Sequence, residues 1–251
     1  MPDDDQPDVR RQQQATSFGA VAEAYERGRP TYPAEAIDWL LPPGATRVLD
    51  LAAGTGKLTR QLVSRGLEVV AVEPLAGMRE QLASAVPGVP VRAGTAEQIP
   101  LADGSVDAVL VAQAWHWVDP SRAVPEVARV LAPGGQLGLV WNIRDEQEDW
   151  VARLGRILHD PGERDEDRTG GITSPPFGPV QRLTVRWAHR ISRAGLLDLV
   201  GSRSYIATMA PAQRELVLAE VGQLAGTHPA LAGREEFPLP YVTECFRAAL
   251  L

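Results

Sequence analysis

Residues 47–57, RVLDLAAGTGK, constrain the fold more than any other segment of this sequence. A short apolar run ends at Asp50, and a turn containing Gly54 and Gly56 separates it from a helical pattern. Because glycine has no Cβ, such a turn can adopt unusual dihedrals and let a ligand lie against main-chain N–H groups. The pattern predicts a buried strand that delivers a nucleoside to the start of a helix.

A second apolar run, LEVVAVEP at residues 67–74, ends in Glu73. Glu73 follows the glycines at about twenty residues, the spacing typical of an acid that binds ribose. An ionised carboxylate accepts two hydrogen bonds and so matches two neighbouring hydroxyl groups. We therefore expect Asp50 and Glu73, each at the end of a strand, to frame one crevice.

Strand and helix patterns alternate through the first part of the chain. Strands are predicted near residue 48 and at 68–72, 89–93, 108–112 and 136–142, the last after a Pro-Gly-Gly turn at 133–135, and helices at 18–29, 58–65, 75–85 and 120–131. Because these strands are apolar throughout, the sequence predicts an α/β fold whose parallel sheet is covered on both faces.

The pattern changes after residue 142. Residues 160–179 are rich in charge, Gly and Pro and are predicted to form a long loop or lid. Helices are expected at 150–158 and 211–224, and strands at 183–191 and 239–246. Two late strands joined through a helical segment predict an antiparallel end to the sheet.

Composition excludes several classes of protein. The 251 residues carry a net charge of -7, so bulk attraction to nucleic acid is absent. No apolar stretch approaches the roughly 20 residues that span a bilayer, and the first residues lack a signal-peptide pattern. Cys245 is the single cysteine and forms no metal-ligand spacing with the histidines. We therefore predict a cytoplasmic protein without a metal site, a membrane segment or a nucleic-acid partner.

Four ordered motifs resemble those of class I S-adenosylmethionine-dependent methyltransferases, and the resemblance covers nearly the whole chain. The motifs are VLDLAAGTGKLT, AVEP, GTAEQIPLADGSVDAVLVAQAWHWVD and EVARVLAPGGQLGLVWN. SFGAVAEAYERGRPTYP, AWHWVD, SRSY and LPY are further similar to the small-molecule branch with the trans-aconitate and ubiquinone/menaquinone methyltransferases. The resemblance implies methyl transfer from S-adenosylmethionine, with S-adenosylhomocysteine as product.

The resemblance also implies the architecture. It predicts a Rossmann-like, doubly wound, mostly parallel seven-stranded sheet with an antiparallel last strand. A disordered tail at 1–14 is expected to precede a single domain at 15–251. The parts of that domain would be N-terminal lid helices at 15–41, a cofactor-binding core at 42–142, and a lid loop with C-terminal strands at 143–251.

Cofactor-binding residues follow from the matched motifs. The resemblance implies that Asp50 orients the glycine loop and binds the ammonium group, and that the Ala96 N–H meets the adenine ring. Relatives usually carry glycine at the position of Ala52, and either Thr95 or Glu97 is expected to accept from the adenine amino group. The full predicted set is Tyr25, Arg29, Asp50, Ala52, Gly54, Gly56, Glu73, Pro74, Thr95, Ala96, Glu97 and Gln113.

The segment after the predicted strand at 108–112 is expected to face the substrate. Aromatic faces hold cations or planar groups through contacts of about 0.5 to 2 kcal/mol, so Trp115 and Trp117 are predicted substrate residues. The resemblance of the N-terminal segment implies a substrate role for Tyr32 as well. His116 is the candidate general base, because imidazole accepts protons near neutral pH. The alternative for His116 is a packed structural residue between two tryptophans.

Three other functions compete with this prediction. A nicotinamide dehydrogenase is disfavoured because Thr59 stands where its fingerprint needs a third small residue and Asp50 would face a pyrophosphate. A noncatalytic S-adenosylmethionine-binding protein stays open, and a nucleic-acid methyltransferase lacks a basic patch. The predicted methyl acceptor is a small molecule, with a carboxylate or hydroxyl oxygen first and a ring carbon or nitrogen next; the chain is expected to be a monomer or homodimer.

Overall fold

The computed structural model describes residues 29–158, 169–170, 172 and 175–251, and divides the chain into two compact units. Unit 1 comprises Met1–Pro30, Arg144–Arg164 and Trp187–Tyr241, and unit 2 comprises Thr31–Ile143, Asp165–Arg186 and Val242–Leu251. The predicted tail at 1–14 and most of the predicted N-terminal lid lie outside the described residues.

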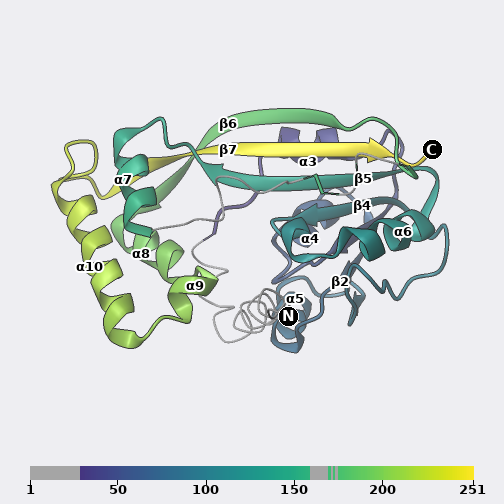
Figure 1. The fold of residues 1–251 in the computed structure, drawn as a ribbon, viewed down its shortest axis with the longest axis horizontal. Helices are drawn as coiled ribbons and strands as arrows, with labels where there is room; N and C mark the ends of the chain where they lie inside the picture. Colours follow the sequence, from purple (N-terminus) through teal and green to yellow (C-terminus); the bar gives the residue numbers. More distant parts are fainter. Residues whose placement is uncertain (1–28, 159–168, 171, 173–174) are drawn as a thin grey trace, which may run out of the picture. The chain divides into compact units, whose positions relative to one another are not determined.

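The described strands form one seven-stranded sheet in the order β3-β2-β1-β4-β5-β7-β6 (Figure 1). Strands β3, β2, β1, β4 and β5 run parallel to one another. The strands are β1 Arg47–Leu51, β2 Glu68–Val72, β3 Val91–Arg92, β4 Val106–Ala112, β5 Leu131–Arg144, β6 Gln181–Ser192 and β7 Glu236–Ala249. The doubly wound, mostly parallel sheet predicted from the sequence is confirmed.

Strand β7 runs antiparallel to both of its neighbours. Against β5, the Asp145 N–H donates to the Pro240 carbonyl at 2.9 Å, and the Leu250 N–H donates to the Gly135 carbonyl at 2.8 Å. Against β6, an ion pair joins Arg190 to Glu236 at 3.3 Å, and Arg182 pairs with Glu244. Residue numbers rise on one strand as they fall on the other, which confirms the antiparallel last strand.

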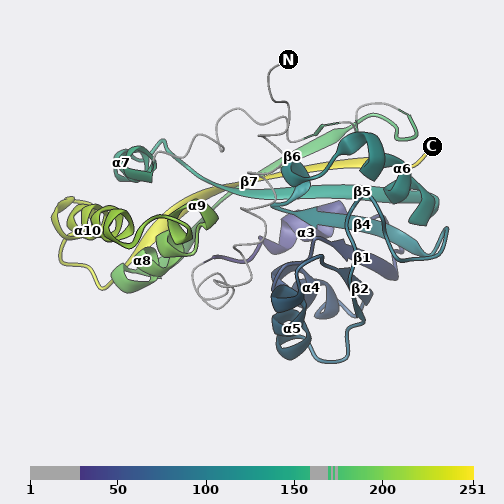
Figure 2. The same ribbon diagram turned by 60° about the horizontal axis from the view of Figure 1, so that its bottom comes forward.

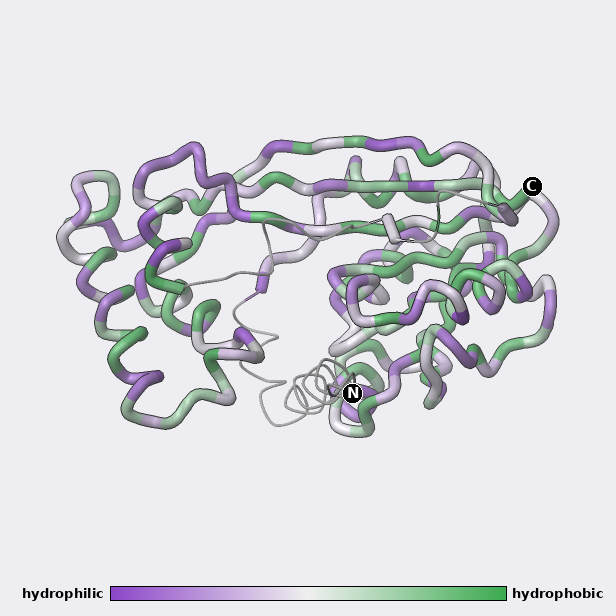
Figure 3. Tube along the Cα trace, in the orientation of Figure 1, coloured by the Kyte–Doolittle hydropathy of each residue, from purple (hydrophilic) through white to green (hydrophobic). Residues whose placement is uncertain are grey.

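Unit 2 places its helices around the parallel strands. They are α3 Ala34–Leu40, α4 Lys57–Val63, α5 Ala76–Ala85, the single-turn 3₁₀ helix η2 Trp115–Trp117, and α6 Pro120–Val130. Helix α6 begins where it does because the Asp119 carboxylate accepts from the Ser121 N–H at 3.0 Å and Pro120 occupies the first helical position. The apolar strands beneath these helices form most of the core of this unit (Figure 3).

Unit 1 has a helical core of its own. Its helices are α7 Asp149–Leu158, α8 Arg193–Gly201, α9 Ser204–Ala207 and α10 Pro211–Thr227 (Figure 2). Trp150 packs edge-on against Phe237 with ring centroids 5.6 Å apart, and Leu154, Leu196 and Val221 are buried in the same cluster. Helices α7 and α10 match the predicted helices, whereas α8 and α9 were not predicted.

Strand β5 differs from its prediction at its start. We expected a turn at 133–135 before the strand, but β5 already begins at Leu131. Its register against β4 shifts between the pair Val106–Leu131 and the pair Ala108–Gln136. Gly134 has a φ of 75°, so the Pro-Gly-Gly segment forms an irregularity inside the strand rather than a turn before it.

None of the helices in the described part of the chain is long and apolar enough to cross a membrane.

Candidate functional site

The carboxyl ends of β1 and β2 bring the two predicted acids together. The strands pair in register, with Asp50 opposite Ala71 and Leu51 opposite Val72. Glu73 follows β2 and is only 5% exposed. Its Oε2 accepts from the Gly54 N–H at 2.9 Å, and its Oε1 accepts from the Leu75 N–H at 2.9 Å. Glu73 therefore fixes the glycine turn directly, a contact that the sequence did not predict.

Asp50 is a buried carboxylate, and one of its two oxygens has no hydrogen-bond partner among the described residues. It is 1% exposed, and its Oδ2 accepts from the Thr59 hydroxyl at 2.5 Å. Its Oδ1 is also buried and has no hydrogen-bond partner among the described residues. A buried oxygen without a donor costs free energy, so this position suits a ligand that brings an N–H or O–H group.

Burial controls the protonation of both acids. It raises the pKa of Asp50 to about 7, a rise that the Thr59 hydrogen bond opposes and the nearby Glu73 charge increases. Burial likewise raises the pKa of Glu73, against the hydrogen bonds from Leu75 and Gly54. Since both shifts disfavour negative charge, a cationic ligand group would restore the ionised forms.

Thr59 is a site residue that the sequence analysis assigned only as a mismatch to a dinucleotide fingerprint. It lies in the first turn of α4, three residues after Gly56, and is fully buried. A hydroxyl at this position of a helix start points back toward the strand that precedes the turn. That spacing is the signal that would have found it.

The turn after β1 contains three left-handed residues, with φ of 57° at Ala52, 56° at Gly54 and 88° at Gly56. A Cβ on Gly56 would lie 2.8 Å from Leu82 Cγ, whereas a Cβ on Gly54 would meet nothing within 4 Å. Gly56 is thus required by packing and conformation together. The open space beside Gly54 leaves room for a ligand against the backbone.

Ala52 adopts the conformation that glycine would adopt without strain. An alanine in the left-handed region costs roughly 1 to 2 kcal/mol, and such strain is concentrated at functional sites. Gln113, after the adjacent strand β4, has a similar φ of 58°. These are the two described non-glycine residues with positive φ, and both follow a parallel strand at its carboxyl end.

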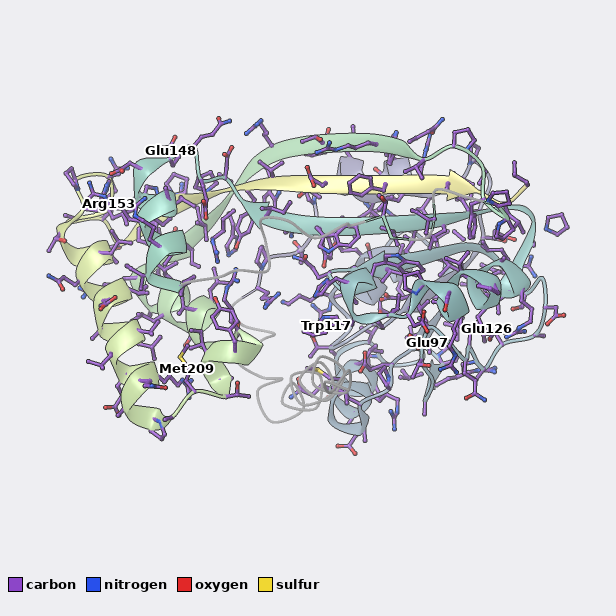
Figure 4. All side chains as sticks on the ribbon, viewed as in Figure 1. Glu97, Trp117, Glu126, Glu148, Arg153 and Met209 are labelled. Atoms are coloured by element: carbon purple, nitrogen blue, oxygen red, sulfur yellow. The ribbon has the colours of Figure 1, made fainter. Side chains whose placement is uncertain are left out.

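The predicted adenine segment follows β3. Thr95 and Gln98 form an isolated bridge, while Ala96 and Ile99 are buried in the core of unit 2. The Ala96 N–H has no hydrogen-bond acceptor in the part of the chain that the structure describes. Glu97 Oε1 accepts from the Asp119 N–H at 2.9 Å (Figure 4). The choice between Thr95 and Glu97 as adenine partner stays a prediction.

The exposed Pro74 follows Glu73 in the loop before α5. Its carbonyl accepts from Arg79 Nη1 at 2.6 Å, and the same nitrogen donates to the Glu73 carbonyl at 3.0 Å. Arg79 thus holds this loop through its backbone rather than through the carboxylate. The cofactor role of Pro74 stays a prediction.

The aromatic residues of η2 separate into two environments. Trp115 is 2% exposed, and its indole Nε1 donates to the Gly170 carbonyl at 2.9 Å. His116 and Trp117 are half-buried, with ring centroids 4.7 Å apart; Trp117 is labelled in Figure 4. Successive side chains of a 3₁₀ helix diverge by about a third of a turn, so the three rings cannot share one direction. Core packing accounts for Trp115 without a ligand; the three predicted roles stay predictions.

The three predicted ligand residues near the N-terminus lie in different parts of the chain, and the structure describes only two of them. Tyr32 is buried in unit 2, and the Gln61 side chain accepts from its N–H at 3.1 Å and donates to its carbonyl at 2.7 Å. Gln61 was not predicted. Arg29 belongs to unit 1, and Tyr25 lies outside the described residues. The ligand roles of Tyr25, Arg29 and Tyr32 stay predictions.

Asn142, near the end of β5, is a further residue that the sequence analysis missed. Its Nδ2 donates to the Thr31 carbonyl at 3.0 Å, and its Oδ1 accepts from the Thr243 hydroxyl at 2.6 Å. Its main-chain carbonyl accepts from Gln113 Nε2 at 3.0 Å. Asn142 is thereby hydrogen-bonded to the end of β4, to β7 and to the chain before α3.

No cluster of three or more potential metal ligands occurs among the described residues. The arrangement instead supplies two buried carboxylates, a spare buried oxygen and an accessible backbone turn. These groups fit a nucleoside that carries a cationic tail. Glu73 would accept from its hydroxyl groups, Asp50 would accept from its ammonium, and the backbone of the glycine turn would lie against the ligand.

Comparisons with known proteins agree with this geometry. Residues 49–139 match the family model described as "Methyltransferase domain". An uncharacterised methyltransferase of Mycobacterium tuberculosis is 58% identical over 241 residues, 96% of this chain and 98% of that protein. A malonyl-[acyl-carrier protein] O-methyltransferase of Methylococcus capsulatus is 40% identical over 134 residues, 48% of each chain. The solved structure of a putative type II methyltransferase from Anaeromyxobacter dehalogenans is 29% identical, with a TM-score of 0.66 and coverage of 88% of this chain and 97% of that one.

Proposed function

Because this chain belongs to the class I S-adenosylmethionine-dependent methyltransferases, we propose that it methylates a small-molecule acceptor, with a carboxylate or hydroxyl oxygen as the receiving atom. The observation that carries the cofactor half of this proposal is the pair of buried acids, Asp50 with a spare Oδ1 and Glu73 beside the glycine turn. Both would lie where a nucleoside with an ammonium tail needs them.

The bound cofactor supplies an electrophilic methyl group on a sulfonium that is already a good leaving group. The residues of the chain therefore need to position the reactants and exclude water, and no protein nucleophile is required. Glu73 would accept from the two ribose hydroxyls, Asp50 would accept from the ammonium through Oδ1, and the Ala96 N–H would donate to the adenine ring. Ile99, buried beside Ala96, would pack on the base.

The acceptor side would be formed by Tyr32, His116 and Trp117 together with Gln113, whose cofactor role predicted from the sequence stays a prediction. With a hydroxyl acceptor, His116 would take the proton that is lost as the new bond to oxygen forms. With a carboxylate acceptor, the oxygen is already a nucleophile and no base is needed. The two cases predict different consequences for loss of the imidazole.

The choice of oxygen is supported by one relative. The Methylococcus capsulatus protein is an O-methyltransferase by its name, and the match covers about half of each chain. Transfer to a ring carbon or nitrogen is the second candidate, and cofactor binding without catalysis is the third. The cytoplasmic location, the monomeric or homodimeric state and the lack of a nucleic-acid partner stay predictions.

The test is incubation of the full chain with methyl-labelled S-adenosylmethionine and a fractionated metabolite extract. We expect one class of acid or alcohol to gain a single labelled methyl group, and the ester or ether product to be identified by mass spectrometry. Glu73→Ala serves as the inactive control. A methylated ring carbon or nitrogen would contradict the oxygen assignment, and no product despite tight S-adenosylhomocysteine binding would favour a noncatalytic protein.

A further inference from the structure

The side chain of Gln113 is held in an unusual way at the carboxyl end of β4. Its backbone is left-handed, with a φ of 58°, and its N–H donates to the Val140 carbonyl at 2.9 Å. Left-handed non-glycine residues persist only where the surroundings impose them, and they are concentrated at ligand sites. The left-handed backbone costs conformational free energy, and this cost indicates that the side chain of Gln113 has a functional role.

The orientation of the Gln113 amide is fixed by a carbonyl group. Nε2 donates to the Asn142 carbonyl at 3.0 Å, and only an NH₂ group can face a carbonyl favourably. The other end of the amide is therefore the acceptor Oε1. Among the described residues Oε1 has no hydrogen-bond partner, and the residue is half-buried.

Asn142 supplies the rigid support for this amide. It is 6% exposed, and both ends of its side chain are engaged, by the Thr31 carbonyl at 3.0 Å and by the buried Thr243 hydroxyl at 2.6 Å. A main-chain carbonyl anchored in this way cannot easily turn to follow a different ligand. The acceptor character of Gln113 is thus set before any ligand binds.

We propose that Gln113 Oε1 is a specificity-determining acceptor that takes a hydrogen bond from an N–H or O–H group of the bound ligand, with Asn142 as its positioning residue. This inference rests on the proposed function and deepens it. An amide oxygen repels a carboxylate, so the ligand group that meets Gln113 must be a donor. The donor is either the ammonium of the cofactor or a hydroxyl or amine hydrogen of the methyl acceptor.

The experiment compares Gln113→Leu and Gln113→Gly with the wild-type full chain. The probes are S-adenosylhomocysteine, which has the ammonium, and 5′-methylthioadenosine, which lacks the amino-acid end, both titrated by calorimetry. Label transfer to the metabolite extract is measured in parallel. Gln113→Gly should melt at the same or a higher temperature because glycine relieves the left-handed strain, while ligand recognition is lost.

Two results support the proposal and distinguish the source of the donor. A tenfold or greater loss of S-adenosylhomocysteine affinity, with methylthioadenosine affinity unchanged, assigns the donor to the cofactor ammonium. Unchanged affinity for both probes, with at least tenfold slower label transfer at low extract concentration and recovery at high concentration, assigns it to the acceptor. The second pattern is a change of KM, which a purely structural role would not produce alone.

Gln136 offers a matched control for the positioning role of Asn142. It lies on the same strand β5, is 8% exposed, and donates from Nε2 to the Leu40 carbonyl at 2.7 Å. Asn142→Leu and Gln136→Leu each remove a buried amide hydrogen bond to the chain around α3. Both should lower the melting temperature, but only Asn142→Leu should reproduce the ligand defect of Gln113→Leu.

Three results overturn the inference. They are full ligand binding and label transfer in both Gln113 variants, equal losses for the two nucleoside probes, and the same ligand defect in Asn142→Leu and Gln136→Leu. If the wild type transfers no label, the calorimetric comparison decides alone. Failure of the wild type to bind S-adenosylhomocysteine at all would instead refute the proposed function.

Discussion

The cofactor side and the acceptor side of unit 2 are built in different ways. The cofactor side, meaning Asp50, the turn at 52–56 and Glu73, is held by contacts between residues no more than 19 positions apart. The acceptor side, meaning Tyr32, Gln113 and the residues of η2, depends on long-range bonds that span 27 to 111 positions, several of them through Asn142. The comparison teaches that a local motif can set the cofactor, whereas the acceptor depends on distant chain segments meeting.

The largest expected effect concerns Asp50 and tests whether water is excluded from the Asp50 carboxylate on the cofactor side. The folded pKa of about 7 lies above the ordinary 3.8, so the folded state keeps a proton that the unfolded state loses between these pH values. Stability should therefore fall as pH rises from 3.8 to about 7, by up to about 4 kcal/mol. Asn carries no such proton, so Asp50→Asn should lack this component.

Urea unfolding from pH 4 to pH 7.5 measures the difference between the wild type and Asp50→Asn, in which the contributions of acids that do not interact with Asp50 cancel. Parallel pH profiles for the two proteins would show that Asp50 is solvated and that the cofactor side is not a low-dielectric site.

The next effect separates the two glycines of the turn. Gly56→Ala combines a left-handed alanine with a Cβ 2.8 Å from Leu82 Cγ, and should cost about 3 kcal/mol of unfolding free energy. Gly54→Ala adds its Cβ to open space and should cost about 1 kcal/mol. Denaturant titration of both variants checks the order, and equal losses would show that backbone conformation alone governs the turn.

His116→Ala tests the acceptor side by itself. With a hydroxyl acceptor, loss of the base should slow turnover about a hundredfold while S-adenosylhomocysteine affinity stays within twofold. Single-turnover label transfer and calorimetry give the two quantities. Wild-type turnover in this variant would assign His116 to packing beside Trp117.

Glu73→Ala should give the opposite pattern. The ribose hydroxyls lose their acceptor, so the Kd for S-adenosylhomocysteine should rise more than tenfold, or about 1.4 kcal/mol and more. Glu80→Ala, an exposed acid on α5, is the matched control and should bind normally. An unchanged Kd in Glu73→Ala would remove this residue from the cofactor side.

The smallest expected effect is a gain. Ala52→Gly relieves the left-handed strain at φ 57° and should stabilise the fold by about 1 kcal/mol. Ala83→Gly, at an exposed position in the last turn of α5, should instead lose up to about 1 kcal/mol because glycine weakens a helix. Thermal melts of the two variants should therefore move in opposite directions; a loss in both would mean that the Ala52 methyl group is needed where it lies.

Prediction from sequence succeeded where periodicity and turn chemistry act within one element. The strands at β1, β2 and β4 and the helices α4, α5 and α6 were placed within a few residues, because buried strands are continuously apolar and the helices carry clear boundaries. The start of β5 was misplaced, since Pro-Gly-Gly indicates a turn and only pairing with β4 makes it an irregularity within a strand. Helices α8 and α9 were missed because their pattern is short and weakly amphipathic.

The site residues also divide into those that local sequence patterns identify and those that they do not. Asp50, Gly54, Gly56 and Glu73 were identified from their order and spacing. Gln61 and Asn142 were not, because an amide in a sequence gives no indication of a partner 29 or more positions away. Thr59 was not identified either, although its partner Asp50 is only nine positions away.

The sequence by itself determined the alternation of strands and helices, the glycine turn and the family, since each can be identified from patterns within single segments and from the order of those segments. Only the tertiary structure decided that Glu73 holds Gly54, that Asp50 keeps a spare oxygen, and that Asn142 sets the Gln113 amide. The physical reason is that burial and hydrogen-bond partners arise when separate segments pack together. A linear pattern fixes which groups are present, and packing fixes which of them are left for a ligand.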